Sequence, residues 1–320
     1  MAGPLIATHS RHPPTVKTRA ASLSIASNAL LIALKLAAGA ITGSVAIITE
    51  AMHSSIDLIA SIVAYVSVRK ADKPADADHP YGHDKIENLA AAIEAMLILV
   101  GSGIIVFESV RRLSTGAEVH SLGVGIGVIA FSVLANVGVS SVLARRARET
   151  DSPALEGDAA HLRTDAATSA AVLAGLVVVE LTGATWLDPV VALTVAAAIV
   201  YAGVRLLMRA SRVLVDEALP PEELDAVRAA VAEFGPQGVV GYHKLRARRA
   251  GSRRYVDLHV QFVAGTTLED AHATAHRLQD AIRERVRGAD VLIHLEPEGS
   301  VHPGTEIARG SAHSRLPDHD

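Results

Sequence analysis

Six long apolar segments dominate this sequence, and each is near the roughly 20 residues that a helix needs to cross a bilayer. Of the 320 residues, 50% are hydrophobic. The mean hydropathy of +0.31 is high for a soluble protein of this size. The sequence therefore predicts an α-helical membrane protein with six transmembrane helices, at about 21–42, 45–68, 86–109, 121–143, 156–182 and 186–208.

The charge balance and the lack of cysteine exclude some classes of function. The formal net charge is −4, so no strong basic field attracts nucleic acid, and we expect no nucleic-acid partner. The chain has no cysteine, which excludes disulfides and thiolate metal sites. Any metal site must therefore use imidazole and carboxylate ligands.

Basic residues indicate how the helices are oriented in the membrane. In the six-helix arrangement, only Arg111 and Arg112 fall on one side. The opposite side carries Arg11, Lys17, Arg19, Arg69, Lys70, Lys73, Lys85, Arg145, Arg146, Arg148, Arg205, Arg209 and Arg212. The positive-inside rule then places both termini in the cytoplasm of a multi-pass protein. We expect this membrane to be the inner cell membrane.

The composition changes after about residue 212. Two amphipathic segments with helical periodicity and three segments with strand-like alternation follow in the order α-β-β-α-β. This order predicts a C-terminal α+β ferredoxin-like domain. The predicted organisation is a cytoplasmic N-terminal tail (1–20), a transmembrane domain (21–212), a cytoplasmic metal-binding dimerisation domain (213–298) and a polar tail expected to be disordered (299–320).

Two apolar segments contain a histidine and an aspartate four residues apart. The sequence HSSID gives His53 and Asp57, and HLRTD gives His161 and Asp165. Residues at this spacing share one helix face. His53 and Asp57 lie about nine to thirteen residues from the outer end of their helix, and His161 and Asp165 about eight to twelve from the inner end of theirs. At 1.5 Å per residue both pairs come near mid-membrane. Ionisable residues at that depth usually face the bundle interior.

The two pairs together offer two imidazoles and two carboxylates, a set that suits tetrahedral zinc. One such pair alone is more often a polar packing contact, but two pairs at matching depth favour a metal site. Glu50 and Asp158 precede the histidines by three residues. They either orient the ligands, line the entrance or pack. Three other charged residues in the first and third segments are interpreted as packing or interfacial residues: Lys35, Glu87 and Glu94.

The segment between the second and third apolar segments reads DADHPYGHDKIEN and contains Asp76, His79 and His83. A histidine pair at this spacing beside an acid is a plausible metal clip. A solvated loop is an equally good interpretation of these three residues alone.

The motif HPYGHDKIEN, the paired HxxxD segments, the six spans and the terminal domain together resemble the cation diffusion facilitator family of divalent-metal/proton antiporters. The resemblance covers about residues 20–298. It implies a transport site at His53, Asp57, His161 and Asp165, and a loop site at Asp76, His79 and His83. It also implies a site bridging a homodimer through the cytoplasmic domain, at His243, His259, His272, His294 and Glu296.

The function that the resemblance implies is efflux of Zn²⁺ from the cytoplasm in exchange for protons, with Zn²⁺ both transported and regulatory. Ligation needs neutral histidine and ionised aspartate, so metal and protons compete for the same site. The alternatives are Cd²⁺, Co²⁺, Ni²⁺, Fe²⁺ or Mn²⁺ as substrate, or a passive metal channel. An intramembrane metalloenzyme is disfavoured because neither motif has a catalytic acid beside the ligands, as HExxH does. We therefore expect a transporter, not an enzyme.

Overall fold

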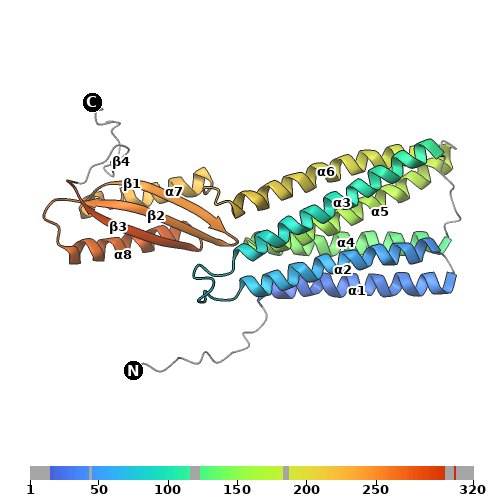
Figure 1. Ribbon diagram of the computed structural model, residues 1–320, viewed down its shortest axis with the longest axis horizontal. Helices are drawn as coiled ribbons and strands as arrows, with labels where there is room; N and C mark the ends of the chain where they lie inside the picture. The colour runs from blue at the N-terminus through green and yellow to red at the C-terminus, as the bar shows by residue number, and fades with distance from the viewer. Residues whose placement is uncertain (1–14, 43–44, 116–122, 183–186, 300–305, 308–320) are drawn as a thin grey trace, which may run out of the picture. The chain divides into compact units, whose positions relative to one another are not determined.

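The computed structural model describes residues 15–42, 45–115, 123–182, 187–299 and 306–307 (Figure 1). The chain divides into two compact units, Met1–Ser211 and Arg212–Asp320. The first unit is helical and the second is a small α/β unit.

Six long helices of 27 to 31 residues make up the described part of the first unit. They are α1 (Val16–Thr42), α2 (Val45–Ala71), α3 (Lys85–Thr115), α4 (Gly123–Thr150), α5 (Pro153–Thr182) and α6 (Leu187–Leu214). At 1.5 Å per residue each is about 40 Å long or more. Helix α5 contacts α1, α2, α3 and α4, so it is the central helix of the unit.

Three of these helices are apolar enough over a sufficient length to cross a membrane: Val16–Ala37 in α1, Lys85–Arg111 in α3 and Ala192–Leu214 in α6, among the residues that could be searched. Helix α5 places Glu156, Asp158, Arg163 and Asp165 within its first half, which lowers its mean hydropathy. A membrane crossing by all six helices stays a prediction.

The helices extend beyond the predicted apolar segments. For example, α4 continues to Thr150, whereas the apolar segment ends near residue 143. Apolarity marks only the part of a helix that contacts lipid, whereas the backbone hydrogen bonds continue into the polar layer. Helix ends therefore could not be read from hydropathy alone.

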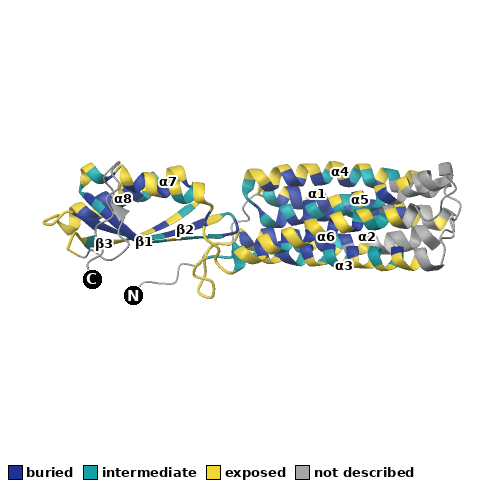
Figure 2. Ribbon diagram, turned by 90° about the horizontal axis from the view of Figure 1, so that it is seen from above, coloured by how far each residue is buried: buried dark blue, intermediate teal, exposed yellow. Residues whose placement is uncertain are grey.

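Small residues fill much of the interior of the helical unit, where Figure 2 shows the buried positions on the facing sides of the helices. The largest buried cluster includes Ala20 and Ala21 of α1, Ala90 of α3, and Ala154 and Ala159 of α5. Alanine lets helix backbones approach closely, which is typical of packing inside membranes. Close approach also brings polar side chains of neighbouring helices within bonding distance.

The second unit contains α7 (Pro221–Ala232), η1 (Gly235–Gln237), β1 (Val239–Ala250), β2 (Arg253–Phe262), α8 (Leu268–Arg285) and β3 (Ala289–Pro297). The order of the main elements matches the predicted α-β-β-α-β order. Strands β1 and β2 form a hairpin, and β2 pairs with β3 in parallel after the crossover through α8. The helices and the sheet share one apolar core that includes Val227, Leu278 and Leu258.

A short fourth strand, β4 (Glu306–Ile307), pairs with β1 and completes the sheet order β3-β2-β1-β4. These two residues are part of the sheet, which corrects the expectation of a disordered tail over 299–320. A strand of two residues has no alternation to read, and its pairing depends on the open edge of β1. Residues 300–305 and 308–320 lie outside the described residues.

Candidate metal centres

Asp57 of α2 meets His161 and Asp165 of α5 inside the helical unit. His161 Nε2 lies 3.3 Å from Asp57 Oδ1 and 3.8 Å from Asp165 Oδ2. One donor atom of each residue lies within 4.8 Å of the other two. His161 and Asp165 are one turn apart on α5, and α5 contacts α2, so the two sequence motifs converge.

This cluster is well buried, and its donors do not satisfy one another. The exposed fractions of Asp57 and His161 are 7% and 5%. Within the described residues, neither ring nitrogen of His161 has a hydrogen-bond partner with good geometry. Buried polar atoms without partners are costly. Donors around a tetrahedral zinc ion, with bonds near 2.1 Å, lie roughly 3.4 Å apart, so the observed spacing suits a bound ion.

His53 and Glu50 belong to α2, but their side chains lie outside the described residues. The structure therefore brings together three of the four predicted transport ligands. The fourth ligand, His53, stays a prediction from its spacing to Asp57.

A polar network lies beside the cluster, on α1, α2 and α5. Asp158 Oδ1 accepts hydrogen bonds from the hydroxyls of Ser24, at 3.1 Å, and Ser61, at 3.2 Å. Asn28 Nδ2 donates to Ser61 Oγ at 2.8 Å and approaches the backbone carbonyl of Asp57 at 3.5 Å. The network connects Asp158 to the backbone of a predicted transport ligand.

Three further charged side chains, Lys35, Glu87 and Glu94, are buried in the helical unit. Lys17 Nζ donates to Glu87 Oε1 at 2.8 Å, and Ser152 donates to the other oxygen of Glu87. Lys35 Nζ donates to Ser54 Oγ at 2.6 Å. Glu94 is fully buried. All three residues, Lys35, Glu87 and Glu94, are buried between helices, as packing residues would be.

The loop between α2 and α3 brings Asp76, His79 and His83 together. His79 Nδ1 lies 3.3 Å from Asp76 Oδ1, and His83 Nε2 lies 3.4 Å from Asp76 Oδ2. Gly82 has a φ of +87° between the two histidines, a conformation that glycine adopts without strain. The tight turn at Gly82 places both rings on the same carboxylate.

Asp76 is held in position by the backbone of its own loop. Its Oδ1 accepts hydrogen bonds from the backbone N–H of His79 at 2.8 Å and of Asp78 at 3.1 Å. The His79 backbone hydrogen bond is the main reason why the pKa of Asp76 is lowered below its ordinary value. The carboxylate is therefore ionised and ready to bind a cation at neutral pH.

Three histidines form a row across the sheet of the second unit. His243 of β1 pairs in register with His259 of β2, which pairs with His294 of β3. Glu296 follows on the same face of β3, two residues after His294. His243 Nε2 donates to Glu296 Oε2 at 2.7 Å, and His259 Nδ1 donates to Glu296 Oε1 at 2.6 Å.

Glu296 is the centre of this row. Its burial favours the neutral carboxyl group, but the hydrogen bonds from His259 and His243 outweigh that effect and lower the pKa of Glu296 from 4.5 to about 2. His294 Nε2 lies farther away, 3.8 Å from Glu296 Oε1. His243, His259 and Glu296 therefore already have the spacing of a ligand set.

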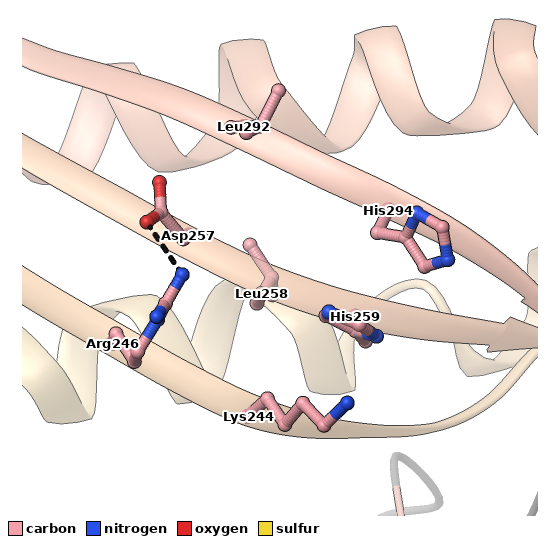
Figure 3. Close-up of a pocket in the computed structure, with 7 residues that line it drawn as sticks. All are labelled: Lys244, Arg246, Asp257, Leu258, His259, Leu292 and His294. Carbon is pink, nitrogen blue, oxygen red and sulfur yellow. Dashed lines mark hydrogen bonds and ion pairs between the residues drawn. The ribbon is translucent and has the colours of Figure 1, made fainter.

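A pocket of about 380 Å³ opens beside this row (Figure 3). His259 and His294 line it, together with Lys244, Arg246, Asp257, Leu258 and Leu292. His294 is 63% exposed in its side chain, so the row opens to the surrounding solution at β3.

His272, the fifth predicted ligand of the cytoplasmic site, lies on α8 and is not part of this row. Its Nε2 lies 3.1 Å from Nε2 of His276, one turn along the helix. The structure thus separates His272 from the other four predicted ligands within one chain.

Two family models match the chain almost from end to end. The model of the cation efflux transmembrane domain matches residues 21–215, and that of the cation efflux protein cytoplasmic domain matches residues 219–298. The chain belongs to the cation efflux family, the cation diffusion facilitators. The family predicted from HPYGHDKIEN and the paired HxxxD motifs is confirmed.

Three relatives, one transporter and two cation-efflux pumps, are similar to this chain over most of their length. The uncharacterised transporter sll1263 of Synechocystis is 35% identical over 87% of this chain and 89% of its own. The cation-efflux pump FieF of Pectobacterium atrosepticum is 31% identical over 91% of this chain and 96% of its own. The cation-efflux pump FieF of Salmonella newport is 32% identical over 88% of this chain and 92% of its own.

Solved structures that cover about a quarter of this chain also match. The zinc form of the transporter CzrB is 36% identical over 27% of this chain and 98% of that chain, with a TM-score of 0.26. The metal-bound C-terminal domain of the CzcD transporter from Thermotoga maritima is 26% identical over 26% and 100%, with a TM-score of 0.24.

Family membership fixes the general activity of this cation diffusion facilitator. It is a membrane transporter that exports divalent cations, and it has a small cytoplasmic α/β domain. The match to the cytoplasmic-domain model supports metal ions and a second copy of the chain as partners.

Sequence reasoning missed part of the polar interior of this transporter. Ser24, Asn28 and Ser61 have no motif, and only the structure brings them to Asp158. Glu94 did carry a signal, because it is an acid within the otherwise apolar run AAIEAMLILV.

Proposed function

We propose that this cation diffusion facilitator exports Zn²⁺ from the cytoplasm in exchange for protons. The transported ion is bound by Asp57, His161 and Asp165, with His53 as the fourth ligand. The observation that carries the proposal is the convergence of one imidazole and two carboxylates from α2 and α5 in a buried interior. The nitrogen and oxygen donors suit zinc in tetrahedral geometry.

Exchange with protons follows from the chemistry of the same ligands. Zinc binds a neutral imidazole and ionised carboxylates, so metal entry displaces protons from the site and proton entry displaces the metal. Histidine changes its charge near physiological pH, which makes the exchange reversible under cellular conditions. Rocking of the helices around this fixed site would open it alternately to each side of the membrane.

The membrane arrangement in this proposal has α1 to α6 each crossing the bilayer of the inner cell membrane, with both termini in the cytoplasm. The excess of basic residues on one side of that arrangement supports it. The loop cluster of Asp76, His79 and His83 then lies on the cytoplasmic side. There it can collect the ion before transport.

The cytoplasmic row has a regulatory role in this proposal. His243, His259, His294 and Glu296 would hold Zn²⁺, and His272 of a second copy of the chain would complete a site that bridges a homodimer. His272 lies outside the row within one chain, which fits a ligand supplied by the partner. Metal binding there would favour one transport state only through a difference in affinity between states.

Other metals and a passive channel are the competing interpretations. Cd²⁺, Co²⁺, Ni²⁺ and Fe²⁺ accept the same ligands, whereas Mn²⁺ favours more oxygen donors. A channel conducts through weak, successive sites, whereas four converging donors bind tightly. Direct competition between metals and the dependence of flux on a pH gradient separate these alternatives.

The test is Zn²⁺ uptake into proteoliposomes, recorded with a zinc-sensitive dye in the lumen, with and without an imposed pH gradient. We expect uptake by the wild type to follow the gradient, and uptake by Asp57→Asn to fall by at least a factor of about 100, because one ligand is lost. Asp72→Asn is the matched control, since Asp72 is exposed just beyond the end of α2.

Uptake by the wild type that ignores the gradient would rule out antiport and favour a channel. Normal uptake by Asp57→Asn would show that this cluster only packs helices. Preference for another divalent metal in a competition assay would leave the site in place and change its substrate.

A further inference from the structure

Glu94 of α3 is a carboxylate buried against α5 without a partner. It is 0% exposed, and neither of its side-chain oxygens has a hydrogen-bond partner among the described residues. The backbone of α5 makes room for it at Gly157, where an added Cβ would clash with Glu94 Oε2 and lie 3.2 Å from the Cα of Ala91. Glycine at position 157 therefore allows the acid to reach α5.

Asp158, the next residue on α5, is also fully buried. Its Oδ1 accepts hydrogen bonds from Ser24 and Ser61, but its Oδ2 has no hydrogen-bond partner in the described part of the chain. The charges of Glu94 and Asp158 lie near enough to repel each other. The interior thus contains two neighbouring acids with three unsatisfied oxygen atoms between them.

The described basic side chains around this acid pair bond to other groups, and His161 also acts on Asp158 through its charge when it is protonated. On α1, Lys17 donates to Glu87 of α3, and Lys35 donates to Ser54 of α2. His161 of α5 faces Asp57 and Asp165.

The described residues of the neighbouring helix α6 that pack here carry no charge. Helix α6 packs on α3 next to Glu94 through apolar residues, Ile199 and Leu206 against Ala95 and Ile98. Two ionised carboxylates in such surroundings would be very costly. A proton removes one charge, and the resulting carboxyl group can donate to the other acid.

The acid pair is close to the metal cluster. Asp158 and His161 are three residues apart on α5, which places them on one helix face at roughly 5–6 Å between Cβ atoms. Asn28 connects Ser61, a donor to Asp158, with the backbone carbonyl of Asp57. A doubly charged ion at the cluster would strongly favour ionisation of acids at this distance in a low dielectric.

We propose that Glu94 and Asp158 together bind one proton, which is released when a divalent cation occupies the cluster of Asp57, His161 and Asp165. The site is a proton-carrying acid pair outside the set of metal ligands. It rests on the proposed function, because it assigns part of the proton exchange to residues that do not bind the metal.

The test measures protons released when Zn²⁺ binds to the detergent-solubilised full chain, in weak buffer with a pH indicator. The difference in released protons between the wild type and Asp57→Asn gives the number of protons that metal binding at the transport cluster releases. We expect Glu94→Gln to reduce that number by about one proton per ion. Glu108→Gln is the matched control on the same helix, where Glu108 pairs with Arg111 at the protein surface.

Asp158→Asn is a second, independent variant. Because the pair shares one proton, Asp158→Asn and the double variant should lose as much release as Glu94→Gln alone. Additive losses would overturn the shared proton.

Release by Glu94→Gln and Asp158→Asn equal to that of the wild type would overturn this inference and leave the proposed antiport intact. Equal release by the wild type and Asp57→Asn would instead contradict proton exchange at the transport cluster, and both proposals would fail together.

Discussion

Glu296 shows how one side chain can couple a ligand set to the stability of its domain. Its two oxygens accept hydrogen bonds from His243 and His259, on two different strands. In the absence of metal these bonds join β1, β2 and β3 through one carboxylate. The same oxygens and nitrogens are the atoms that would bind a metal ion. Metal binding would therefore replace the protons of these hydrogen bonds without rearranging the sheet.

The lowered pKa of Glu296 predicts a pH dependence for the metal-free domain. A carboxyl group whose pKa falls from 4.5 to about 2 on folding stabilises the fold above pH 4.5. That contribution is lost as the pH falls from about 4.5 towards 2. With metal removed by chelation, Glu296→Gln should lower the unfolding free energy of β1–β3 at pH 6 by on the order of 2 kcal/mol. The difference should shrink towards pH 3.

Hydrogen exchange of the β1–β3 peptides, followed by mass spectrometry, measures this unfolding free energy in the full chain. Glu284→Gln is the control, because Glu284 is an exposed acid on α8 of the same unit. A difference between Glu296→Gln and the wild type that stays constant from pH 6 to pH 3 would contradict the linkage.

At the scale of elements, α6 is held against α3 by a close approach at one glycine. A Cβ added at Gly203 would lie 3.0 Å from Leu99 Cδ2 and 3.2 Å from Ile98 Cγ2. Contacts this short require the neighbouring side chains to move. By contrast, a Cβ added at Gly101, on α3, would have no described atom within 4 Å.

These two glycines give opposite predictions. Gly203→Val should destabilise the detergent-solubilised chain by roughly 1–3 kcal/mol, because the branched side chain overpacks the contact between α3 and α6. Gly101→Ala should be neutral or stabilising by up to about 1 kcal/mol, because alanine favours the helix. Thermal unfolding followed by circular dichroism compares the two variants. A lower midpoint for Gly101→Ala than for Gly203→Val would contradict this packing.

The elements also show what a sequence can and cannot predict. Apolar length predicts where the helices of the first unit lie, and alternation predicts β1, β2 and β3, because each pattern is local. The spacing of His161 and Asp165 predicts their shared face for the same reason. The pairing of Glu94 with Asp158 could not be predicted, since it depends on the close approach of α3 and α5 at Gly157, which no local pattern records.

At the scale of the whole molecule, the chain joins two units whose surfaces suit different surroundings, lipid for the first and water for the second. The first unit has an interior of small residues and buried polar groups, and several large apolar side chains, such as Leu134 and Phe107, are exposed on its helices. The second unit has its own apolar core between helices and sheet. A unit with a complete core of its own can fold without the rest of the chain.

We therefore predict that residues 212–299, expressed alone, form a soluble folded domain that binds Zn²⁺ through the histidine row. Isothermal titration should show that His259→Ala weakens binding by at least a factor of about 10, because His259 is the central ligand of the row. His276→Ala should bind like the wild type, because His276 lies on α8 outside the row.

The mass of the domain in solution, measured by light scattering, should approach that of a dimer when zinc is added. Binding by His259→Ala as tight as binding by the wild type would contradict a zinc site in the row, and a domain that remains unfolded alone would show that its core needs the helical unit.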